Sequence, residues 1–293
     1  MNKIMYNGYR GAIASLSAIA SFVATPVMAF SITPGTSNLL DTLLGDTTGL
    51  SDFSLTTIGS SQAFGQFTDD PFGLGSGIVL STGKVAEIPG ENTLSVYDFD
   101  LNHDFAPTAL PGYSSGELGD NIQLDLSFFA DSSVEKLFFN YVFGSEEFRE
   151  YGGSPFNDSF ELLLNGINLA KLSDGQNVTI NNLVPSYDNP SLDHPDYINN
   201  PVGSGVNTKL DGYTRTLGFE GLLAQNNRNT LSIRIKDVGD GWLDSAVFIQ
   251  AGSVGTVPVT APGVSVPEPS LLLGLLAMGS FGLFGGLKKK QGL

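Results

Sequence analysis

Regular alternation of apolar and polar residues marks the middle of the chain. In residues 137–143 the odd-numbered positions are Leu, Phe, Tyr and Phe, and the even-numbered ones are Phe, Asn and Val. Because successive side chains of a strand point to opposite faces, this segment has one apolar face and a second that is nearly so. The pattern is typical of a central strand covered on both faces. Residues 158–164 alternate more cleanly, and the connection between the two segments is acidic and glycine-rich.

Short alternating segments recur along the body of the chain. They predict strands over residues 55–59, 63–67, 78–82, 122–129, 137–143, 158–164, 178–181, 213–217, 230–238 and 245–251. A short helix is predicted over 37–43, with Ser37 as its N-cap and Gly45 as its stop. Connectors rich in Gly, Pro, Asn and Asp indicate an all-β fold, an antiparallel β-sandwich of the jelly-roll kind. The polar segment 186–212 is predicted as a long surface loop with a functional role.

The first 29 residues have the pattern of a secretory signal peptide. Lys3 and Arg10 precede a stretch of small apolar residues at 12–23, and Val-Met-Ala at 27–29 resembles a cleavage site. The alternative is an N-terminal membrane anchor, but the apolar stretch is short for a membrane span. We therefore expect export through the Sec translocon and removal of residues 1–29 by signal peptidase.

The other end combines a linker, an apolar stretch and a basic cluster. Residues 270–287 carry no charge and precede Lys288, Lys289 and Lys290, which predicts a transmembrane helix with a cytoplasmic basic end. The alternative is a buried core helix, which the glycines and the terminal position disfavour. The predicted organisation is a signal peptide at 1–29, a β-sandwich domain at 30–253, a linker at 254–265 and a C-terminal membrane segment at 266–290.

Charge divides the chain into an acidic body and basic ends. The formal net charge is −16, yet five of the 14 basic residues lie in the two ends, where Glu268 is the sole acid. Such a body repels nucleic acid and anionic lipid and attracts divalent cations. The 293 residues include no Cys, so an exported fold of this sequence depends on its core or on a metal ion.

Oxygen-bearing side chains beside the central strand are the candidates for a metal site. Ca²⁺ takes six to eight oxygen ligands from carboxylates, amides and carbonyls. The candidate ligands for a structural Ca²⁺ are Glu146, Glu147, Asn157, Asp158, Asp240 and Asp244. Because Glu146 and Glu147 are adjacent, an extended backbone directs only one of them inward. The alternative is that these side chains hold turns through hydrogen bonds to backbone N–H groups.

A second acidic segment has the D-x-D-x-N spacing that begins a calcium loop. Its members are Asp98, Asp100, Asn102 and Asp104. It departs from the EF-hand pattern, because a histidine stands at the glycine position and an alanine at that of the bidentate glutamate. It is therefore the weaker candidate.

Glycoside hydrolysis is the sharper alternative for the first acidic region. It requires two carboxyl groups about 5–10 Å apart, one of them with a raised pKa, and Glu147 with Asp158 are the candidates. An aromatic residue nearby offers a surface for a sugar ring: Trp242, with Tyr187 or Tyr197 from the long loop. The alternative for Trp242 is a partly buried core position.

The C-terminal segment resembles a known sorting signal. Pro267, Glu268 and Pro269, followed by the apolar stretch and the basic end, are similar to the PEP-CTERM sorting signal of Gram-negative bacteria. The resemblance implies recognition in the inner membrane by an exosortase, cleavage near the motif and delivery outward. It also implies association with exopolysaccharide and the cell surface.

Five motifs in the body resemble the choice-of-anchor L domain. They are GIVLSTG at 77–83, DFDL at 98–101, YVFGSEEF at 141–148, FNDSF at 156–160, and DVGD at 237–240 with LDSAVFI at 243–249. The resemblance covers residues 37–252, and it implies a location and an architecture but no enzymatic activity. One departure is Arg149, which follows the EEF sequence where the family pattern leads us to expect proline; its positive charge would weaken a metal site. We expect a non-catalytic exported surface or matrix protein, with a secreted polysaccharide hydrolase as the alternative.

Overall fold

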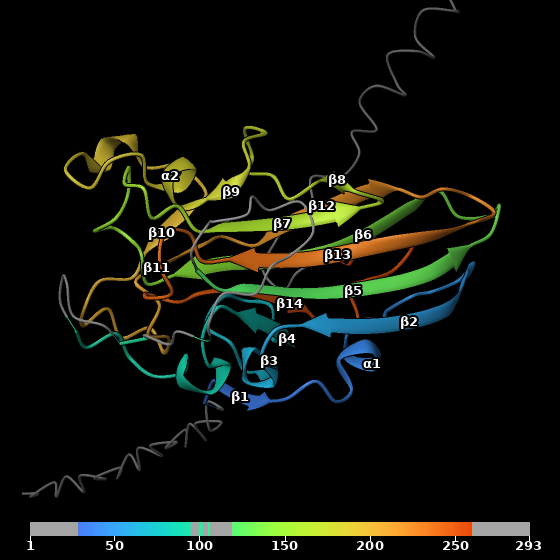
Figure 1. Ribbon diagram of the computed structural model, residues 1–293, viewed down its shortest axis with the longest axis horizontal. Helices are drawn as coiled ribbons and strands as arrows, with labels where there is room; N and C mark the ends of the chain where they lie inside the picture. The colour runs from blue at the N-terminus through green and yellow to red at the C-terminus, as the bar shows by residue number, and fades with distance from the viewer. Residues whose placement is uncertain (1–28, 95–99, 102–104, 106–118, 260–293) are drawn as a thin grey trace, which may run out of the picture.

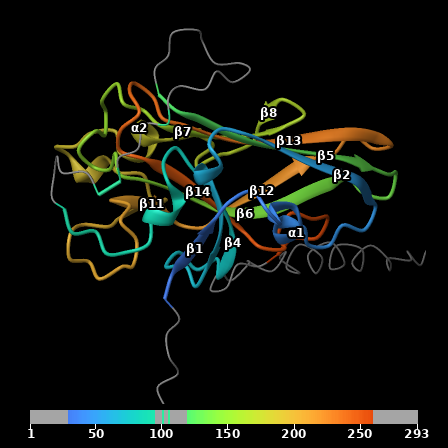
Figure 2. The same cartoon turned by 60° about the horizontal axis from the view of Figure 1, so that its bottom comes forward.

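Two antiparallel sheets pack face to face in the computed structural model, which describes residues 29–94, 100–101, 105 and 119–259 (Figures 1 and 2). Sheet I, the 8-stranded one, has the order β1 (Ser31–Pro34), β3 (Phe64–Thr68), β4 (Ser76–Ser81), β14 (Ser245–Gln250), β6 (Lys136–Ser145), β11 (Gly212–Thr214) and β10 (Tyr197–Asn199), with β12 (Leu217–Leu222) also paired to β6. Sheet II, the 6-stranded one, has the order β2 (Leu50–Ile58), β5 (Asn121–Ala130), β13 (Asn227–Lys236), β7 (Ser159–Leu164) and β8 (Ile167–Asn168), with β9 (Val178–Thr179) on β7. The predicted all-β sandwich is confirmed.

The main core lies between the sheets and consists of every second residue of their strands. From sheet I the odd-numbered apolar residues of β6 point inward, and from sheet II the even-numbered ones of β5 and β7 and the odd-numbered ones of β13 do so. Opposite rows meet through aromatic contacts, such as Tyr141 on Phe160 with ring centroids 5.0 Å apart. The outward positions of sheet II are polar: Arg234 binds Glu161 at 3.1 Å and Gln123 at 2.7 Å.

Sheet I is covered on its outer face as well. A second apolar cluster gathers there around Phe248 of β14, whose ring lies 5.5 Å from that of Phe67 and 4.6 Å from that of Phe72. Val142, an even-numbered residue of β6, is buried in this second cluster. The prediction of a central strand covered on both faces is thereby confirmed for β6.

Local signals explain where the elements differ from the predicted ranges. The strand predicted over 178–181 ends at Thr179, because this residue caps α2 (Ile180–Leu183) by accepting a hydrogen bond from Asn182 N at 3.2 Å. The strand predicted over 213–217 divides into β11 and β12, which pair with different parts of β6. The first helix, α1 (Leu39–Leu43), has Asn38 rather than Ser37 at its N-cap, in the left-handed region with φ 58°.

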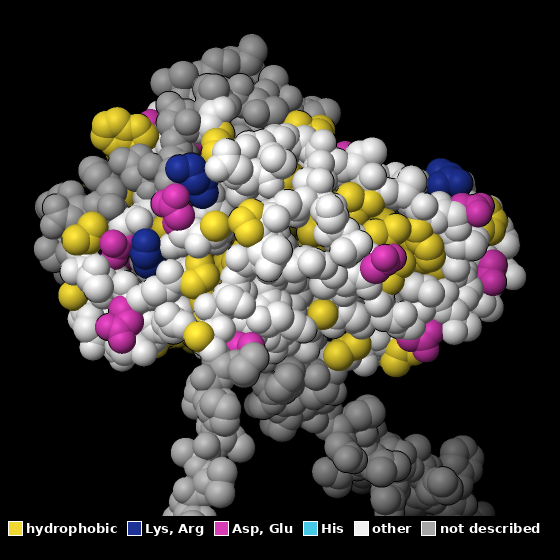
Figure 3. All heavy atoms as spheres, turned by 90° about the horizontal axis from the view of Figure 1, so that it is seen from below, with side chains coloured by type: hydrophobic (Ala, Val, Ile, Leu, Met, Phe, Trp, Pro, Cys, Tyr) yellow, Lys and Arg dark blue, Asp and Glu magenta, His cyan; other side chains and the backbone are white. Residues whose placement is uncertain are grey.

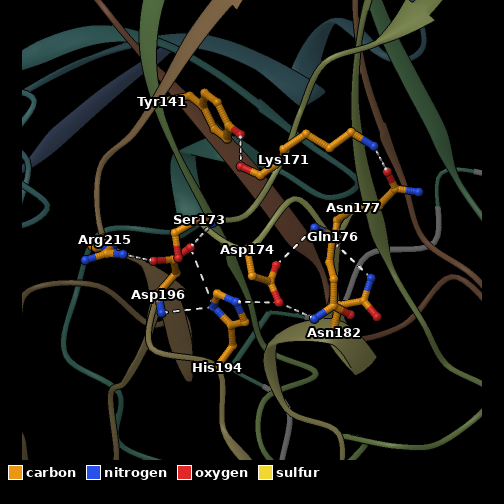
Figure 4. A network of polar contacts seen from close by, with 10 residues as sticks. All are labelled: Tyr141, Lys171, Ser173, Asp174, Gln176, Asn177, Asn182, His194, Asp196 and Arg215. Atoms are coloured by element: carbon orange, nitrogen blue, oxygen red, sulfur yellow. Dashed lines mark hydrogen bonds and ion pairs between the residues drawn. The ribbon is translucent and has the colours of Figure 1, made fainter.

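The long polar loop is held in place by a buried carboxylate, Asp196 (Figure 4). This carboxylate contacts the guanidinium of Arg215 and accepts a hydrogen bond from Ser173 N at 2.6 Å. Asp196 N donates to His194 Nδ1 at 3.1 Å, and Nε2 of the same ring lies 3.3 Å from Asp174 Oδ2. The predicted surface loop therefore contains a strand, β10, and a fixed polar network.

Asp196→Ala is expected to destabilise the domain, because it removes the buried carboxylate that binds Ser173 N and Arg215. Hydrogen bonds to a charged group contribute about 1.5–3 kcal/mol, which corresponds to a melting temperature lower by about 3–10 °C for a domain of this size. The measurement is thermal unfolding followed by circular dichroism. Asp174→Ala, at the exposed edge of the same network, is the control, and an equal loss in both variants would contradict the assignment.

Residues 254–259, which belong to the predicted linker, lie against the sandwich. Val254 is buried, and Thr256 N donates a hydrogen bond to Asp46 O at 2.8 Å. Farther along, Asn140 Nδ2 donates to Val259 O at 2.7 Å. The chain therefore leaves the described part of the domain along β6.

The predicted leader up to residue 28 and the apolar stretch 270–287 lie outside the described residues, as do the three sorting-motif residues. Among the residues that are described, no helix combines the length and apolar character needed to cross a membrane. On the face of the sandwich shown in Figure 3, acidic side chains are scattered and basic ones are few. This surface does not present the basic patch that nucleic-acid binding requires.

Candidate metal centre

Three strands continue their inward-facing rows into a carboxylate at the same end of the sandwich, where β10, β11 and α2 also lie (Figure 1). Glu147 follows β6, Asp158 precedes β7 and Asp237 follows β13, each in step with the core residues of its strand. Asp240 and Asp244 come from the connection between β13 and β14. We call these five residues the acid cluster. Burial is the main cause that raises the pKa of each of the first three, and negative charge on other members of the cluster adds to it, as expected of neighbouring carboxylates.

Asp158 is the fully buried member whose hydrogen bonds are satisfied. Its Oδ1 accepts from Val238 N at 2.9 Å, and its Oδ2 accepts from the hydroxyl of Ser245 at 2.6 Å. Burial raises the pKa of Asp158 to about 8, although both hydrogen bonds oppose this. The residue therefore ties three chain segments together.

Asp237 is fully buried, and neither of its carboxylate oxygens has a hydrogen-bond partner among the described residues. Burial is the main cause that raises the pKa of Asp237 to about 12, and the charges of Asp158 and Glu147 add to it. Glu147 is 1% exposed, and its Oε2 has no partner within the described ranges either. Burial is the main cause that raises the pKa of Glu147 to about 10, and the negative charges of Asp158 and Asp240 add to it.

Two glycines allow backbone and carboxylate to approach each other closely beside the cluster. A Cβ on Gly83 would lie 1.8 Å from Asp244 Oδ2, so any side chain there would displace the carboxylate. A Cβ on Gly119 would lie 2.2 Å from the carbonyl oxygen of Asp237 and 2.4 Å from that of Asp240. Carbonyl oxygens therefore accompany the carboxylates at this end of the sandwich.

Two of the predicted ligands accept hydrogen bonds from backbone N–H groups. Asn157 Oδ1 accepts a hydrogen bond from Asn181 N at 2.8 Å, so its oxygen is engaged by the first turn of α2. Glu146 points to the opposite side of β6 from Glu147, where its oxygens accept from the backbone N–H groups of Asp100 and Leu101. Burial raises the pKa of Glu146 to about 9. Both side chains thus hold neighbouring backbone segments through hydrogen bonds, which is the alternative to metal binding.

The second predicted acidic segment is described only in part. Asp98, Asn102 and Asp104 lie outside the described residues. Asp100 Oδ2 accepts hydrogen bonds from the backbone N–H groups of Thr93 at 3.1 Å and Leu94 at 3.4 Å. This carboxylate holds its own loop.

Arg149 is directed away from the acid cluster. Its guanidinium binds Asp193 at 2.9 Å and Ser186 O at 3.2 Å, and both partners belong to the long loop. The positive charge that was expected to weaken a metal site is thus engaged elsewhere.

The predicted aromatic surface for a sugar ring is not assembled as expected. Trp242 is half exposed beside Asp240, whereas Tyr197 packs its ring 4.8 Å from that of Phe148 and donates its hydroxyl hydrogen bond to Asn199. Tyr187 is 42% exposed and lines a cavity to which Trp242 does not contribute.

Sequence reasoning missed Asp237 as a candidate ligand. The signal was present, because Leu231, Ile233 and Ile235 form the inward row of β13 and Asp237 is the next residue of that row. A carboxylate that continues a core-facing row is a stronger sign of a polar site than a carboxylate in a loop.

As they stand, no group of three or more His, Cys, Asp and Glu side chains in the described part of the chain is arranged so that it could hold a metal ion. The chemistry of the cluster is nevertheless that of a hard cation, which is bound by carboxylate and carbonyl oxygens. A cation would require the side chains of the cluster to close around it.

Two family models match the chain. The choice-of-anchor L domain matches residues 31–255, and the PEP-CTERM protein-sorting motif matches residues 265–290. Neither a curated protein nor a solved structure matches significantly. The sorting motif marks a protein that is anchored transiently in the membrane, processed by an exosortase and delivered to the cell surface. The chain therefore belongs to the choice-of-anchor L family and carries a PEP-CTERM sorting motif.

Proposed function

We propose that this exported surface protein is a non-catalytic matrix component whose sandwich is stabilised by Ca²⁺ at the acid cluster and which associates with exopolysaccharide. Export through the Sec translocon and cleavage by signal peptidase would precede sorting. The observation that carries the calcium proposal is Asp237, a fully buried carboxylate without a hydrogen-bond partner in the described structure.

A cation is the simplest way to compensate these buried charges. An unpaired buried charge is costly, so such groups pair, protonate or bind metal. Within the described structure, the charges that act most strongly on Asp237 are those of Asp158, Glu147, Asp240 and Asp244, all of them negative. Ca²⁺ suits the cluster because its coordination is flexible and includes backbone carbonyls and water. Extracellular calcium modules bind with dissociation constants of about 10⁻⁴–10⁻³ M.

The same geometry favours binding over hydrolysis. A glycosidase needs two carboxyl groups in contact with a polymer, one protonated and one ionised. Here Glu147 and Asp158 are 1% and 0% exposed, and burial raises the pKa of both. A hydrolase would release reducing ends from exopolysaccharide, and this release would be lost in the Glu147→Gln variant.

Equilibrium dialysis of the full chain in detergent against radioactive Ca²⁺ tests the metal directly. The expected result is about one Ca²⁺ per chain, lost in Asp237→Asn. Glu135→Gln is the matched control, because Glu135 is exposed at the opposite end of β6. Equal binding by the two variants, or none by the wild type, would contradict the proposal.

In the absence of metal, stability is expected to fall as pH rises. Glu147, Asp158 and Asp237 have pKa values near 10, 8 and 12 in the folded chain, against about 4 when unfolded. The folded state therefore binds more protons above about pH 4, and its stability declines as the pH rises through the folded values. Thermal melting in EDTA between about pH 5 and 9 measures this decline, which Ca²⁺ should reduce. A melting temperature that rises with pH in EDTA would refute this expectation.

A further inference from the structure

A cavity of about 320 Å³ lies between the long loop and the segment that follows β6. Its wall includes Asn92, Arg149, Glu150, Tyr187, Val202 and Asp211, and no member of the acid cluster. The volume is within the range of small-molecule sites, which begins at about 300 Å³. The Asp196 network of Figure 4 holds the same loop, and Arg149 is bound to that loop through Asp193. The wall is thus held by fixed contacts.

Three polar atoms of this wall are buried and unused. Asn92 is 4% exposed; its Nδ2 donates to Asn200 O at 2.9 Å and to Asp211 Oδ1, whereas its Oδ1 has no partner in the described ranges. Arg149 Nε and Glu150 Oε2 are likewise buried and unpartnered as far as the chain is described. Because buried polar groups are nearly always hydrogen-bonded, one donor and two acceptors here point to a ligand that supplies both.

The charge of the wall argues against an anionic ligand. The guanidinium of Arg149 is bound to Asp193 at 2.9 Å, which leaves Glu150 and Asp211 as the carboxyl groups that face the cavity. Burial raises the pKa of Asp211 to about 8, with a smaller effect of Glu150, and burial also raises the pKa of Glu150. Carboxyl groups in such surroundings are suited to exchange hydrogen bonds with neutral hydroxyl groups.

Apolar surface completes the cavity. Tyr187 and Val202 line it and are 42% and 48% exposed, and Leu94 lines it at 37%. Exposed apolar groups around a hollow with a few polar atoms are the usual composition of a ligand site. A sugar ring offers the matching combination, with C–H groups on its faces and hydroxyl groups around its edge.

We propose that this cavity binds a short neutral saccharide, with Tyr187 and Val202 against the ring and Asn92, Arg149 and Glu150 bonded to hydroxyl groups. The inference rests on the proposed association with exopolysaccharide and assigns it to a place in the fold. The cavity and the acid cluster share no residue, so saccharide binding and calcium binding are tested with different variants.

Titration calorimetry of the full chain, in a detergent without a sugar headgroup, tests the proposal. The probes are cellotriose, maltotriose and mannotriose as neutral saccharides, trigalacturonate as an anionic one and trilysine as a basic peptide. At least one neutral trisaccharide is expected to bind, with an affinity at least tenfold higher than those of trigalacturonate and trilysine. Tighter binding of trilysine would identify a basic peptide as the ligand and overturn the proposal, and so would binding of none of the neutral saccharides.

Two variants locate the site. Tyr187→Ala and Glu150→Gln are expected to weaken saccharide binding at least tenfold, whereas Leu222→Ala, an exposed apolar residue of β12, should leave it unchanged. Unchanged melting temperatures show that the variants fold. If native exopolysaccharide sediments equally with wild type and Tyr187→Ala, the cavity is not the site although the surface association stands. If it sediments with neither, the association itself fails.

Discussion

Removing Ca²⁺ from the chain is expected to lower its melting temperature by about 5–15 °C. A ligand that binds only the folded state, present at 100 to 1,000 times its dissociation constant, stabilises by about 2.7–4.1 kcal/mol. For a domain of this length, each kcal/mol corresponds to about 2–4 °C. Without the cation, the buried carboxyl groups of Glu147 and Asp237 must bind protons or carry uncompensated charge.

Differential scanning calorimetry of the full chain, in EDTA and in a series of Ca²⁺ concentrations, measures this effect. The melting temperature should rise with the logarithm of the Ca²⁺ concentration. Mg²⁺ is the control, because it requires near-ideal octahedral geometry and gives up its water reluctantly, so its effect should be smaller. Identical melting with EDTA and with Ca²⁺ would exclude a structural calcium ion.

Asp237→Asn is expected to change stability in opposite directions with and without the metal. In EDTA near pH 7 the wild-type residue must bind a proton, because its pKa is raised to about 12, whereas an asparagine is neutral at no cost. The variant should then be more stable by about 2–4 kcal/mol. In excess Ca²⁺ it lacks a ligand and should melt below the wild type.

This crossover separates a metal ligand from a structural carboxylate. Melting curves of wild type, Asp237→Asn and Glu135→Gln, each in EDTA and in Ca²⁺, provide the comparison. Glu135→Gln removes the same charge at an exposed position and should shift neither curve. A variant that is less stable than the wild type under both conditions would show that Asp237 has only a structural role.

The strands were predictable where one face of the strand is buried in the core, because apolar and polar residues then alternate along the sequence. The alternating rows of β6, β7 and β13 give the core directly, and their continuation by one residue pair also locates Glu147, Asp158 and Asp237. Sequence reasoning used this parity to separate Glu146 from Glu147, and the structure places them on opposite sides of β6. It did not extend the parity beyond the last apolar residue of β13, and for that reason missed Asp237.

The remaining features depend on contacts between distant segments. Asn157 has the residue type of a calcium ligand, yet a helix of four residues that begins more than twenty positions later takes its oxygen. The saccharide cavity joins Asn92, Glu150, Tyr187 and Asp211, whose separation along the chain carries no local signal. Short strands such as β1 and β10 form because a neighbouring strand supplies hydrogen bonds, which propensity does not register.

The hydrogen bonds that hold residues 254–259 against the sandwich limit the distance between the sandwich and the sorting motif. Seven residues separate Val259 from Pro267, and fully stretched they span at most about 30 Å. While these contacts are intact, the sandwich therefore lies within about 30 Å of the sorting motif. A cut near the motif would leave the folded body close to its new C-terminus, with little chain between the two.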